Sequence, residues 1–536
     1  MIQRNTRRYQ YVSALIWLSV FIVVFSGVLI LILSGSDDYR QCKAPLDVAP
    51  YRGIGIGVNV SFSRLLSISD DIHTHVYPFD PSDISELMDQ QDGIPYPPGI
   101  KFPEFSNLLW GWLQMVSYDM ILTKPGNVSD TMYSGTGMPP LIRSSYELDD
   151  HGDRQQINYA TPYLDGSTIY GLDLATAFSL RRLDGTGKMK VSATPYQDIN
   201  DADLLFKAAD PRVNQNPLLT ALHILLVREH NYWCDRLKYD MSYLTENELF
   251  NMARHFVISE MQAITYREVL PLLLGIDTLD PSTCFTHIEF NNAHAIKTKN
   301  GKKYSHRTSV LNEFAVGASR ILHSMVTDHL TLRNPQTGEI TQQVNTTDHC
   351  NNESLLWTFG IDDILLGASL QPAEKRDISL IDSLRNYHIC NTSMILDLAA
   401  IDITRGRDHS VPSYQDFYRH FKKISPMSSV YCEDFAYSSE ICNAIEGIYG
   451  SSTAPIDLFL GLLIEKRYGR STLGIVGTNL FKFQFSHIKH NDHYFYLWDR
   501  VIDGYVVEVH NIRLSKIILR NTNINSDIMD PNVFLV

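Results

Sequence analysis

The sequence has little of the positive charge, paired cysteine or repetition that marks several common protein classes. Lys and Arg number 46 against 60 Asp and Glu, which gives a formal net charge of −14. This balance argues against a nucleic-acid-binding surface, which requires a basic patch. The seven cysteines form no Cys-x-x-Cys metal pair, and no repeat or low-complexity tract is present. Strand-like patterns are few and short, which disfavours an all-β fold.

Helical patterns account for most of the apolar content, which is 44% of the 536 residues. The sequence Thr245-Glu-Asn-Glu248 forms a capping box that predicts the start of a helix running to about Glu268. The stretch 139–159 is predicted to be a polar loop. Further helices are predicted at 106–120, from Pro217 onward, and at 311–328, 353–366, 374–386, 393–401 and 412–422. The pattern indicates one large, mainly α domain over residues 96–536.

The N-terminal region predicts a membrane anchor. The apolar run Val12 to Leu33 is long enough to cross a bilayer, follows three arginines within residues 1–11, and precedes Asp37 and Asp38. The positive-inside rule then places residues 1–11 in the cytosol and the rest outside it. Residues 34–95 are predicted to be a stalk and irregular lead-in. The expected protein is a single-pass type II membrane protein with a lumenal or extracellular C-terminal domain; a cleaved signal peptide is the alternative.

Glycosylation sequons and cysteines agree with export. Five Asn-x-Ser/Thr sequons lie after the predicted anchor, at Asn59, Asn127, Asn345, Asn352 and Asn391. In an oxidising compartment most of the seven cysteines should pair, and Cys432 and Cys442 are the nearest neighbours in sequence. One thiol must then remain, with Cys42 near the membrane as a candidate, and spacing does not fix the connectivity.

His323 is the first candidate for a functional residue. Phe314, Ala318, Leu322 and Met325 recur at helical spacing and place His323 beside an apolar face. An imidazole in this position is a good ligand for iron or zinc, although a single histidine beside an apolar face is more often an ordinary core residue. Position alone therefore leaves both interpretations open.

Five motifs in a fixed order favour the ligand. They are Val227-Arg-Glu-His-Asn231, the run Ile264 to Gly275, Arg320-Ile-Leu-His323, the run Leu398 to His409, and Ile456-Asp-Leu-Phe-Leu-Gly461. Together they resemble the animal haem peroxidases (myeloperoxidase-like proteins and the peroxidase-like domains of dual oxidases), from about Pro95 to the end of the chain. The resemblance implies a mainly α fold, a haem b cofactor with His323 as axial ligand, and hydrogen peroxide as oxidant.

On the distal side of the haem, the chain departs from the family pattern. The family has Gln, two apolar residues, Asp, His, Asp, whereas this chain has Gln114-Met-Val-Ser-Tyr-Asp119. Tyr118 therefore stands at the catalytic histidine position, and Ser117 stands where a carboxylate esterifies the haem. The second ester position is Gln215, three residues after a retained Arg212. The resemblance then implies a haem held without covalent linkage to the protein.

The exchange of histidine for tyrosine affects peroxide chemistry directly. Splitting peroxide requires a group that takes and returns a proton near neutral pH, and a phenol with pKa ~10 stays protonated there. Arg212 and Gln114 remain to stabilise charge and to orient peroxide. Tyr118 is then either a hydrogen-bond donor or radical site, or a remnant of a lost site.

On the proximal side, the resemblance implies a group that binds the Nδ1–H of His323. The family has an asparagine there, and this chain has Asp402. A carboxylate would increase the electron density on iron and lower its reduction potential. The alternative is a helix residue paired with Arg405 or Arg320. Arg320 is also a candidate partner for a haem propionate.

A calcium site is predicted in the loop Thr161-Pro-Tyr-Leu-Asp-Gly-Ser167. Thr161, Asp165 and Ser167 supply side-chain oxygens and Tyr163 supplies a carbonyl, which suits the irregular oxygen cages that calcium accepts. The resemblance adds Asp119 as a further ligand. A polar turn without an ion is the alternative.

Two functions follow from these expectations. The first is a membrane-anchored haem oxidoreductase with weak or altered peroxidase activity toward small phenolic donors or protein tyrosines. The second is a catalytically inactive pseudoperoxidase that serves as an exported interaction or maturation module.

Overall fold

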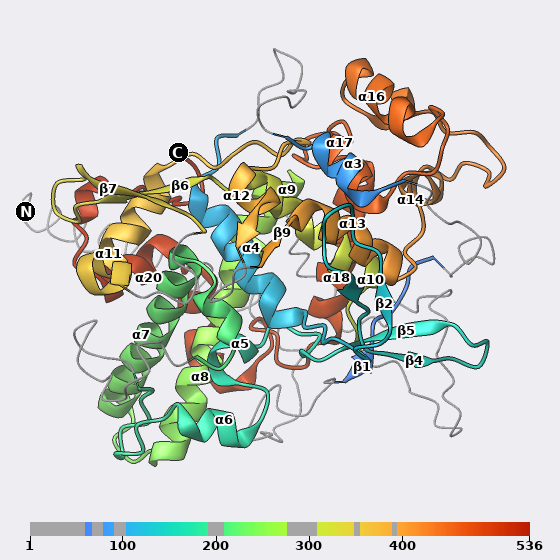
Figure 1. Cartoon of the computed structure of the whole chain (residues 1–536). Coiled ribbons are helices and arrows are strands. Elements are labelled where there is room, and N and C mark those ends of the chain that lie inside the picture. The colour runs from blue at the N-terminus through green and yellow to red at the C-terminus, as the bar shows by residue number, and fades with distance from the viewer. Residues whose placement is uncertain are drawn as a thin grey trace, which may run out of the picture.

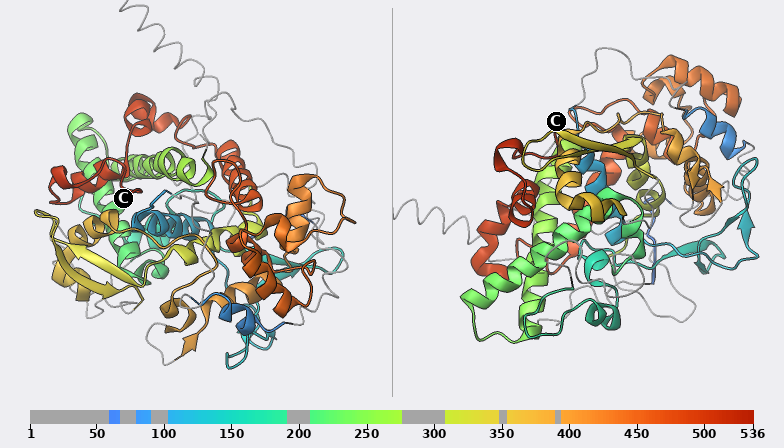
Figure 2. Two further views of the ribbon diagram at one scale, coloured as in Figure 1. Left: turned by 90° about the horizontal axis from the view of Figure 1, so that it is seen from above. Right: turned by 60° about the vertical axis from the view of Figure 1, so that its left-hand side comes forward.

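The computed structural model describes residues 59–66, 79–89, 103–190, 208–275, 308–347, 354–388 and 394–536. Within these ranges, none of the helices combines the length and the apolar character that crossing a bilayer requires. The predicted anchor at 12–33, the tail before it and most of the predicted stalk lie outside the described residues. Figures 1 and 2 show a mainly helical molecule with a few short strands at its edges.

Helix α4 (Asn107–Met120) passes through the middle of the molecule (Figure 1). Trp110 and Trp112 are both buried, and the indole nitrogen of Trp112 donates to the Thr265 hydroxyl at 3.0 Å. Helices α7 (Pro217–Asp240) and α11 (Ser354–Leu370) and the 3₁₀ segment η3 (Ala318–Met325) pack against α4. Because these elements enclose α4, the helix is held in place, and its few half-buried side chains have fixed positions.

Local sequence explains the boundaries of the two long helices. Asn216 caps α7 by accepting from the Leu219 N–H, and Pro217 occupies the first turn, where no amide hydrogen is needed. The predicted capping box of Thr245 and Glu248 is confirmed at the start of α8 (Glu246–Ile264). Helix α8 continues through the π-helical turn η2 (Thr265–Val269) into α9 (Leu270–Leu274). Helices α7 and α8 pack side by side (Figure 2).

The predicted helix at 311–328 is divided into two pieces. Helix α10 (Asn312–Val316) ends at Gly317, and η3 follows as a tighter 3₁₀ helix that carries His323. A Cβ atom on Gly317 would lie 2.7 Å from the Glu313 carbonyl oxygen and 2.8 Å from Leu458 Cδ2. The close approach of α17 (Leu458–Ile464) therefore requires glycine at the break.

The prediction of a polar loop at 139–159 is wrong, because this stretch contributes three strands. Strand β5 pairs antiparallel with both β4 and β1, with Ser61 opposite Ile157 and Glu147 opposite Gln155. The strands are β1 (Val60–Ser61), β2 (Thr131–Met132), β3 (Leu141–Ile142), β4 (Tyr146–Leu148), β5 (Arg154–Asn158), β6 (His329–Arg333), β7 (Ile340–Asn345), β8 (Tyr387–His388) and β9 (Ile395–Leu396). They form small antiparallel ribbons at the edge of the helical body.

The predicted helix at 374–386 is also wrong in most of its length. Only α12 (Asp382–Arg385) forms there, since Arg376 is buried and donates to the carbonyls of residues 462, 463, 465 and 472. Those bonds hold the segment in an extended course across α17. The remaining helices are α3 (Pro81–Glu86), α5 (Ser167–Tyr170), α6 (Leu174–Ser179), α13 (Leu398–Asp408), α14 (Tyr414–Lys422), α15 (Cys432–Phe435), α16 (Ser439–Tyr449), α18 (Ile475–Asn491), α19 (Val506–His510) and α20 (Leu514–Asn521).

Cysteine pairing agrees with the sequence in the one case that the described residues test. Cys432 and Cys442 form a disulfide with their Cα atoms 5.5 Å apart, which joins α15 to α16. Cys234 is a free, buried thiol on α7. Cys42, Cys284, Cys350 and Cys390 lie outside the described residues.

Candidate functional site

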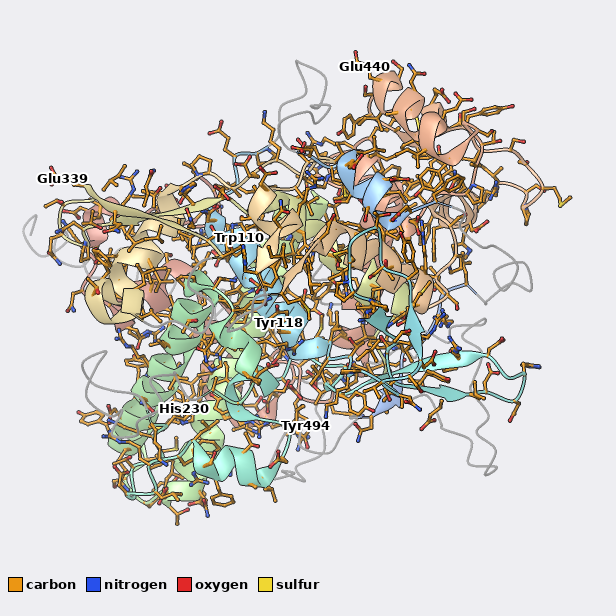
Figure 3. All side chains as sticks on the ribbon, in the orientation of Figure 1. Trp110, Tyr118, His230, Glu339, Glu440 and Tyr494 are labelled. Atoms are coloured by element: carbon orange, nitrogen blue, oxygen red, sulfur yellow. A yellow bond between two sulfur atoms is a disulfide. The ribbon has the colours of Figure 1, made fainter. Side chains whose placement is uncertain are left out.

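The predicted haem-site residues fall into two groups, one on η3 and α13 and the other on α4 and the segment just before α7, and η3 packs against α4. In the C-terminal half of α4, three residues are half-buried, namely Gln114, Ser117 and Tyr118. The other residues of this half, up to Met120, are buried. The spacing of three and four residues places the half-buried side chains on one side of the helix. Figure 3 shows Tyr118 on α4 near the centre of the molecule. On this side of the helix, Gln114 and Tyr118 contact Gln215, and the Tyr118 ring lies under the Arg212 guanidinium.

On the proximal side, the structure joins His323 to Asp402. The Nδ1 atom of His323 lies 2.6 Å from Oδ2 of Asp402, whose side chain is fully buried. Burial opposes ionisation of Asp402, but the charges of His323 and Arg320 outweigh it, so the pKa of Asp402 is lowered from its usual value. Because the carboxyl is ionised, the Nδ1–H of His323 donates to it, and Nε2 is the ring nitrogen left for another partner. No described residue forms a hydrogen bond with Nε2 of His323.

Arg320 contacts the other oxygen of the same carboxylate. Its guanidinium pairs with Oδ1 of Asp402, and its Nε donates to the Ala315 carbonyl at 3.4 Å. Arg405 pairs instead with Asp408 at 2.8 Å. Asp402 therefore combines both roles expected from sequence, as partner of the imidazole and as partner of Arg320. The role of Arg320 toward a haem propionate stays a prediction.

On the distal side, the structure builds a cluster of uncharged groups around Tyr118. The Tyr118 hydroxyl donates to Oε1 of Gln215, and Nε2 of Gln114 donates to the Tyr118 hydroxyl at 3.2 Å and to Gln215 Oε1 at 3.3 Å. Burial raises the pKa of Tyr118, against the opposing effects of Arg212 and of the Gln114 hydrogen bond. The phenol is thus protonated at neutral pH and does not act as a base there.

Arg212 lies against this cluster with most of its donors already engaged. Its Nε atom is 3.0 Å from both oxygens of Asp210, while its terminal nitrogens donate to the carbonyls of Ile121 and Tyr118 at 2.9 and 3.0 Å. The guanidinium also stacks on the Tyr118 ring, 4.2 Å from its centroid. Asp210 thus neutralises the positive charge of Arg212, which was predicted from the sequence to stabilise the charge that develops on peroxide. The catalytic role of Arg212 stays a prediction.

Two residues of the distal cluster were not anticipated from the sequence. Asn216 donates from Nδ2 to Oε1 of Gln114 at 3.0 Å, and Gln215 donates from Nε2 to the Tyr387 hydroxyl at 3.3 Å. Asn216 was recognisable as a helix cap because it precedes Pro217, but not as a neighbour of Gln114. Tyr387 lies in the short strand β8, far along the chain, where no local pattern indicates a functional role.

The predicted calcium loop is attached to α4 through Asp119. One carboxylate oxygen accepts from the amides of Asp165 and Gly166, both at 2.9 Å, and the other accepts from the amide of Thr168 at 3.0 Å. The Ser167 hydroxyl donates to the Asp119 carbonyl at 2.9 Å. Thr161 and Tyr163 also contact each other, with the Thr161 hydroxyl 3.4 Å from the Tyr163 carbonyl oxygen. The loop therefore brings the five predicted residues close together, while calcium binding stays a prediction.

The arrangement fits a haem better than a metal ion held by side chains alone. Across the described ranges there is no group of three or more His, Cys, Asp or Glu residues placed to hold a metal. A single imidazole whose Nε2 makes no hydrogen bond to a described residue, on a segment that packs against α4, suits a cofactor whose iron takes four ligands from the porphyrin. This donor set thus agrees with the cofactor expected from the sequence.

Comparison with known proteins gives the same assignment. The sequence model described as animal haem peroxidase matches residues 79–534. Dual oxidase 1 of Caenorhabditis elegans is 26% identical over 450 residues, covering 76% of this chain and 28% of that protein. Chorion peroxidase of Drosophila melanogaster is 28% identical over 395 residues, covering 69% of this chain and 46% of that protein. The chain therefore spans less than half the length of these relatives.

A solved structure confirms the fold. Peroxidase A from Dictyostelium discoideum superposes with a TM-score of 0.74 at 23% sequence identity, covering 90% of this chain and 98% of that one. At this identity the likeness concerns the arrangement of helices, and the chemistry has to be argued from the side chains.

Proposed function

Because the chain belongs to the animal haem peroxidase family, we propose that it is a haem-binding oxidoreductase that uses hydrogen peroxide weakly, with small phenols or protein tyrosines as donors. The observation that carries the proposal is the pair of His323 and Asp402, 2.6 Å apart, which leaves Nε2 of the imidazole available. Haem would supply the redox-active iron. His323 would hold it, and Asp402 would fix the orientation and the tautomer of the ring.

The haem would be held without covalent bonds to the protein. An ester needs a carboxylate, and the two corresponding positions carry Ser117 and Gln215. Retention then depends on the His323 ligand, on the packing of α4 and η3, and on charges such as Arg320 near the propionates. We expect haem to be lost more readily than from a relative with ester links.

Weak peroxide chemistry follows from the distal residues. Tyr118 is protonated at neutral pH and cannot accept the peroxide proton, and Asp210 already neutralises Arg212. Loss of a positioned acid–base group costs about 10²–10⁴ in rate. Gln114 and Tyr118 remain as neutral polar groups able to orient a bound molecule.

Calcium and a membrane anchor complete the proposal. Asp119, Thr161, Tyr163, Asp165 and Ser167 would hold calcium and so tie the loop to α4. Residues 1–11 would form the cytosolic tail, 12–33 the anchor, and 34–95 the stalk and lead-in, of which β1 and α3 pack against the haem-binding domain of residues 96–536. The domain would then be lumenal or extracellular, as in a type II membrane protein.

A catalytically inactive pseudoperoxidase is the second candidate. It is favoured by the engagement of Arg212 with Asp210 together with the loss of the distal histidine and both ester carboxylates. In that case the fold would serve as an exported interaction or maturation module.

The test of the proposed function is the absorption spectrum of the purified protein after incubation with haem. We expect a Soret band that is abolished by His323→Ala, because the axial ligand is removed. His329→Ala is a matched control, since His329 lies on β6 with an exposed side chain paired with Asp328. Absence of the band in the wild type, or its retention in His323→Ala, would contradict the proposal.

A further inference from the structure

The distal cluster is a continuous chain of hydrogen bonds that starts at the N-terminus of α7. The Leu219 amide donates to Oδ1 of Asn216 at 2.9 Å, and Asn216 then donates from Nδ2 to Oε1 of Gln114 at 3.0 Å. Gln114 donates onward to Tyr118 and Gln215, and Gln215 donates to Tyr387. The Tyr118 hydroxyl donates a hydrogen bond to Oε1 of Gln215. Each link joins a donor to an acceptor.

The first link fixes the direction of all the others. A backbone N–H can only donate, so the atom of Asn216 that faces Leu219 must be the oxygen, and the amide nitrogen must face Gln114. Gln114 must then present its oxygen to Asn216 and its nitrogen to Tyr118 and Gln215. Gln215 in turn presents its oxygen to Gln114 and its nitrogen to Tyr387. The orientation of every side-chain amide follows from one helix cap.

This direction determines what Tyr118 can offer to a ligand. Its oxygen accepts one hydrogen bond from Gln114, and its proton is given to Gln215. One lone pair of the Tyr118 oxygen remains. The two hydrogens on the Gln114 nitrogen are spent within the cluster, and the nearby Arg212 is neutralised by Asp210. The site therefore presents an acceptor, without a free positive charge.

We propose that Gln215 and Tyr387 are positioning residues of the distal site that keep the Tyr118 proton directed into the protein. This inference rests on the proposed function, in that the ligand is one bound at the haem. The distal pocket then favours ligands that bring a hydrogen to donate, such as neutral hydrogen peroxide or an organic hydroperoxide. Anions that only accept hydrogen bonds, such as fluoride, bind poorly.

Fluoride binding to the haem-loaded ferric protein tests the direction of the proton. Gln215→Met removes the acceptor, so the Tyr118 hydroxyl becomes able to donate to fluoride, and we expect about tenfold tighter binding, the usual effect of a hydrogen bond to a charged group. Tyr118→Phe combined with Gln215→Met should lose that gain. Gln342→Met, on the exposed strand β7, is the matched control. Unchanged affinity in Gln215→Met, or a gain that persists in the double variant, would overturn the proposal.

Tyr387 has its own variant in the same assay. Tyr387→Phe removes the partner of the Gln215 nitrogen, so Tyr118 is held less firmly and fluoride affinity should rise by about two- to threefold, less than in Gln215→Met. Tyr418→Phe on α14, whose hydroxyl donates to the Asp434 carbonyl, is the control. Affinity equal to the wild type in Tyr387→Phe would remove Tyr387 from the site.

A thermal-unfolding cycle without haem separates this proposal from the proposed function. Tyr118 and Tyr387 both bond to Gln215, so the Tm shift of the double Tyr→Phe variant should differ from the sum of the single shifts. In a Gln215→Met background the shifts should become additive. Additive shifts in the wild-type background would disprove the chain of hydrogen bonds. If no haem binds, the proposed function and the ligand preference both fail. The unfolding cycle still tests the chain of hydrogen bonds through Gln215, because it is measured without haem.

Discussion

At the scale of single residues, Tyr118 determines the chemistry of the distal half of the site. Around it lie three neutral amides, a second phenol and an ion pair of Arg212 with Asp210. Such a set neither takes up nor releases a proton at neutral pH. The proximal half is different, because the buried carboxylate of Asp402 pairs with Arg320 and His323, which are both half-buried. The proposed function therefore assigns cofactor binding to the proximal side and only weak acid–base chemistry to the distal side.

Restoring a histidine at position 118 should restore part of the peroxidase chemistry. In the haem-loaded protein, Tyr118→His supplies a group with pKa near ~6.5 and should raise the turnover of a phenolic donor at least tenfold. The measurement is the initial rate of peroxide-dependent oxidation at neutral pH. Tyr118→Phe is the control, because it changes the ring without adding a base. Equal rates for all three proteins would show that residue 118 does not face the bound peroxide.

At the scale of elements, sequence predicted those helices that carry their own boundary signals. The capping box fixed the start of α8, and Pro217 marked the start of α7. Prediction from sequence failed where contacts between residues far apart in the chain determine the local structure. The guanidinium of Arg376 holds residues near it extended across α17, although the segment has helical periodicity. The short strands of 139–159 likewise depend on pairing with each other and with β1.

The candidate site was predictable in the same uneven way. His323 and Asp402 were identified because both lie in recognisable motifs, and the structure places them in contact. Tyr387 has no motif and reaches the site only through Gln215. The pairing of Arg212 with Asp210 was also missed, although only one residue separates them in the sequence. Sequence spacing does not reveal the direction in which a side chain points. Roles that depend on side-chain direction require the structure.

The break between α10 and η3 should be sensitive to a single methyl group. Gly317→Ala places a Cβ 2.7 Å from a backbone oxygen, and overpacking of this kind costs about 1–3 kcal/mol. Because η3 carries His323, haem affinity should fall together with the free energy of unfolding. Gly406→Ala in α13 is the matched control, as its Cβ would meet no atom within 4 Å. We expect the control to be neutral or slightly stabilising, and denaturant unfolding with haem titration measures both effects.

The carboxyl group of Glu465, which follows α17 and contacts the N-terminus of α18, gives stability a defined pH dependence. Glu465 is buried and accepts from the amides of Gly474, Val476 and Gly477 at 2.9 to 3.1 Å. Burial raises its pKa to about 7, although Arg376 and these hydrogen bonds oppose the rise. Between the unfolded pKa of ~4.5 and that value the folded state binds the extra proton, so its contribution to stability declines as pH rises.

Glu465→Gln should therefore destabilise the protein less at pH 8 than at pH 5. The wild type loses up to roughly 3 kcal/mol over this interval through Glu465, whereas the amide does not titrate. Denaturant unfolding at both pH values measures the gap between wild type and variant. Glu339→Gln, at the exposed edge of the molecule in Figure 3, corrects for the general effect of removing a carboxylate. A gap that widens with pH would contradict the assignment.

At the scale of the whole molecule, the sequons agree with an exported domain. Asn59, Asn127 and Asn345 are all exposed, and they lie next to β1, before β2 and at the end of β7. Asn127 has a local turn in which its side chain accepts from the Ser129 amide at 3.0 Å. A glycan at any of these positions would project into solvent without disturbing the core. The disulfide of Cys432 and Cys442 is consistent with the same oxidising compartment.

Expression in animal cells tests the proposed topology directly. The full chain should stay with the membrane pellet after alkaline carbonate extraction, because Val12 to Leu33 would span the bilayer, whereas a chain lacking residues 1–33 should not be retained. Asn127→Gln should increase electrophoretic mobility by one glycan, and Asn523→Gln, an exposed asparagine outside any sequon, should not change it. Release of the full chain by carbonate with its glycans intact would indicate a cleaved signal peptide instead. Membrane retention without glycans would place the domain on the cytosolic side and reverse the orientation that the arginines before residue 12 predict.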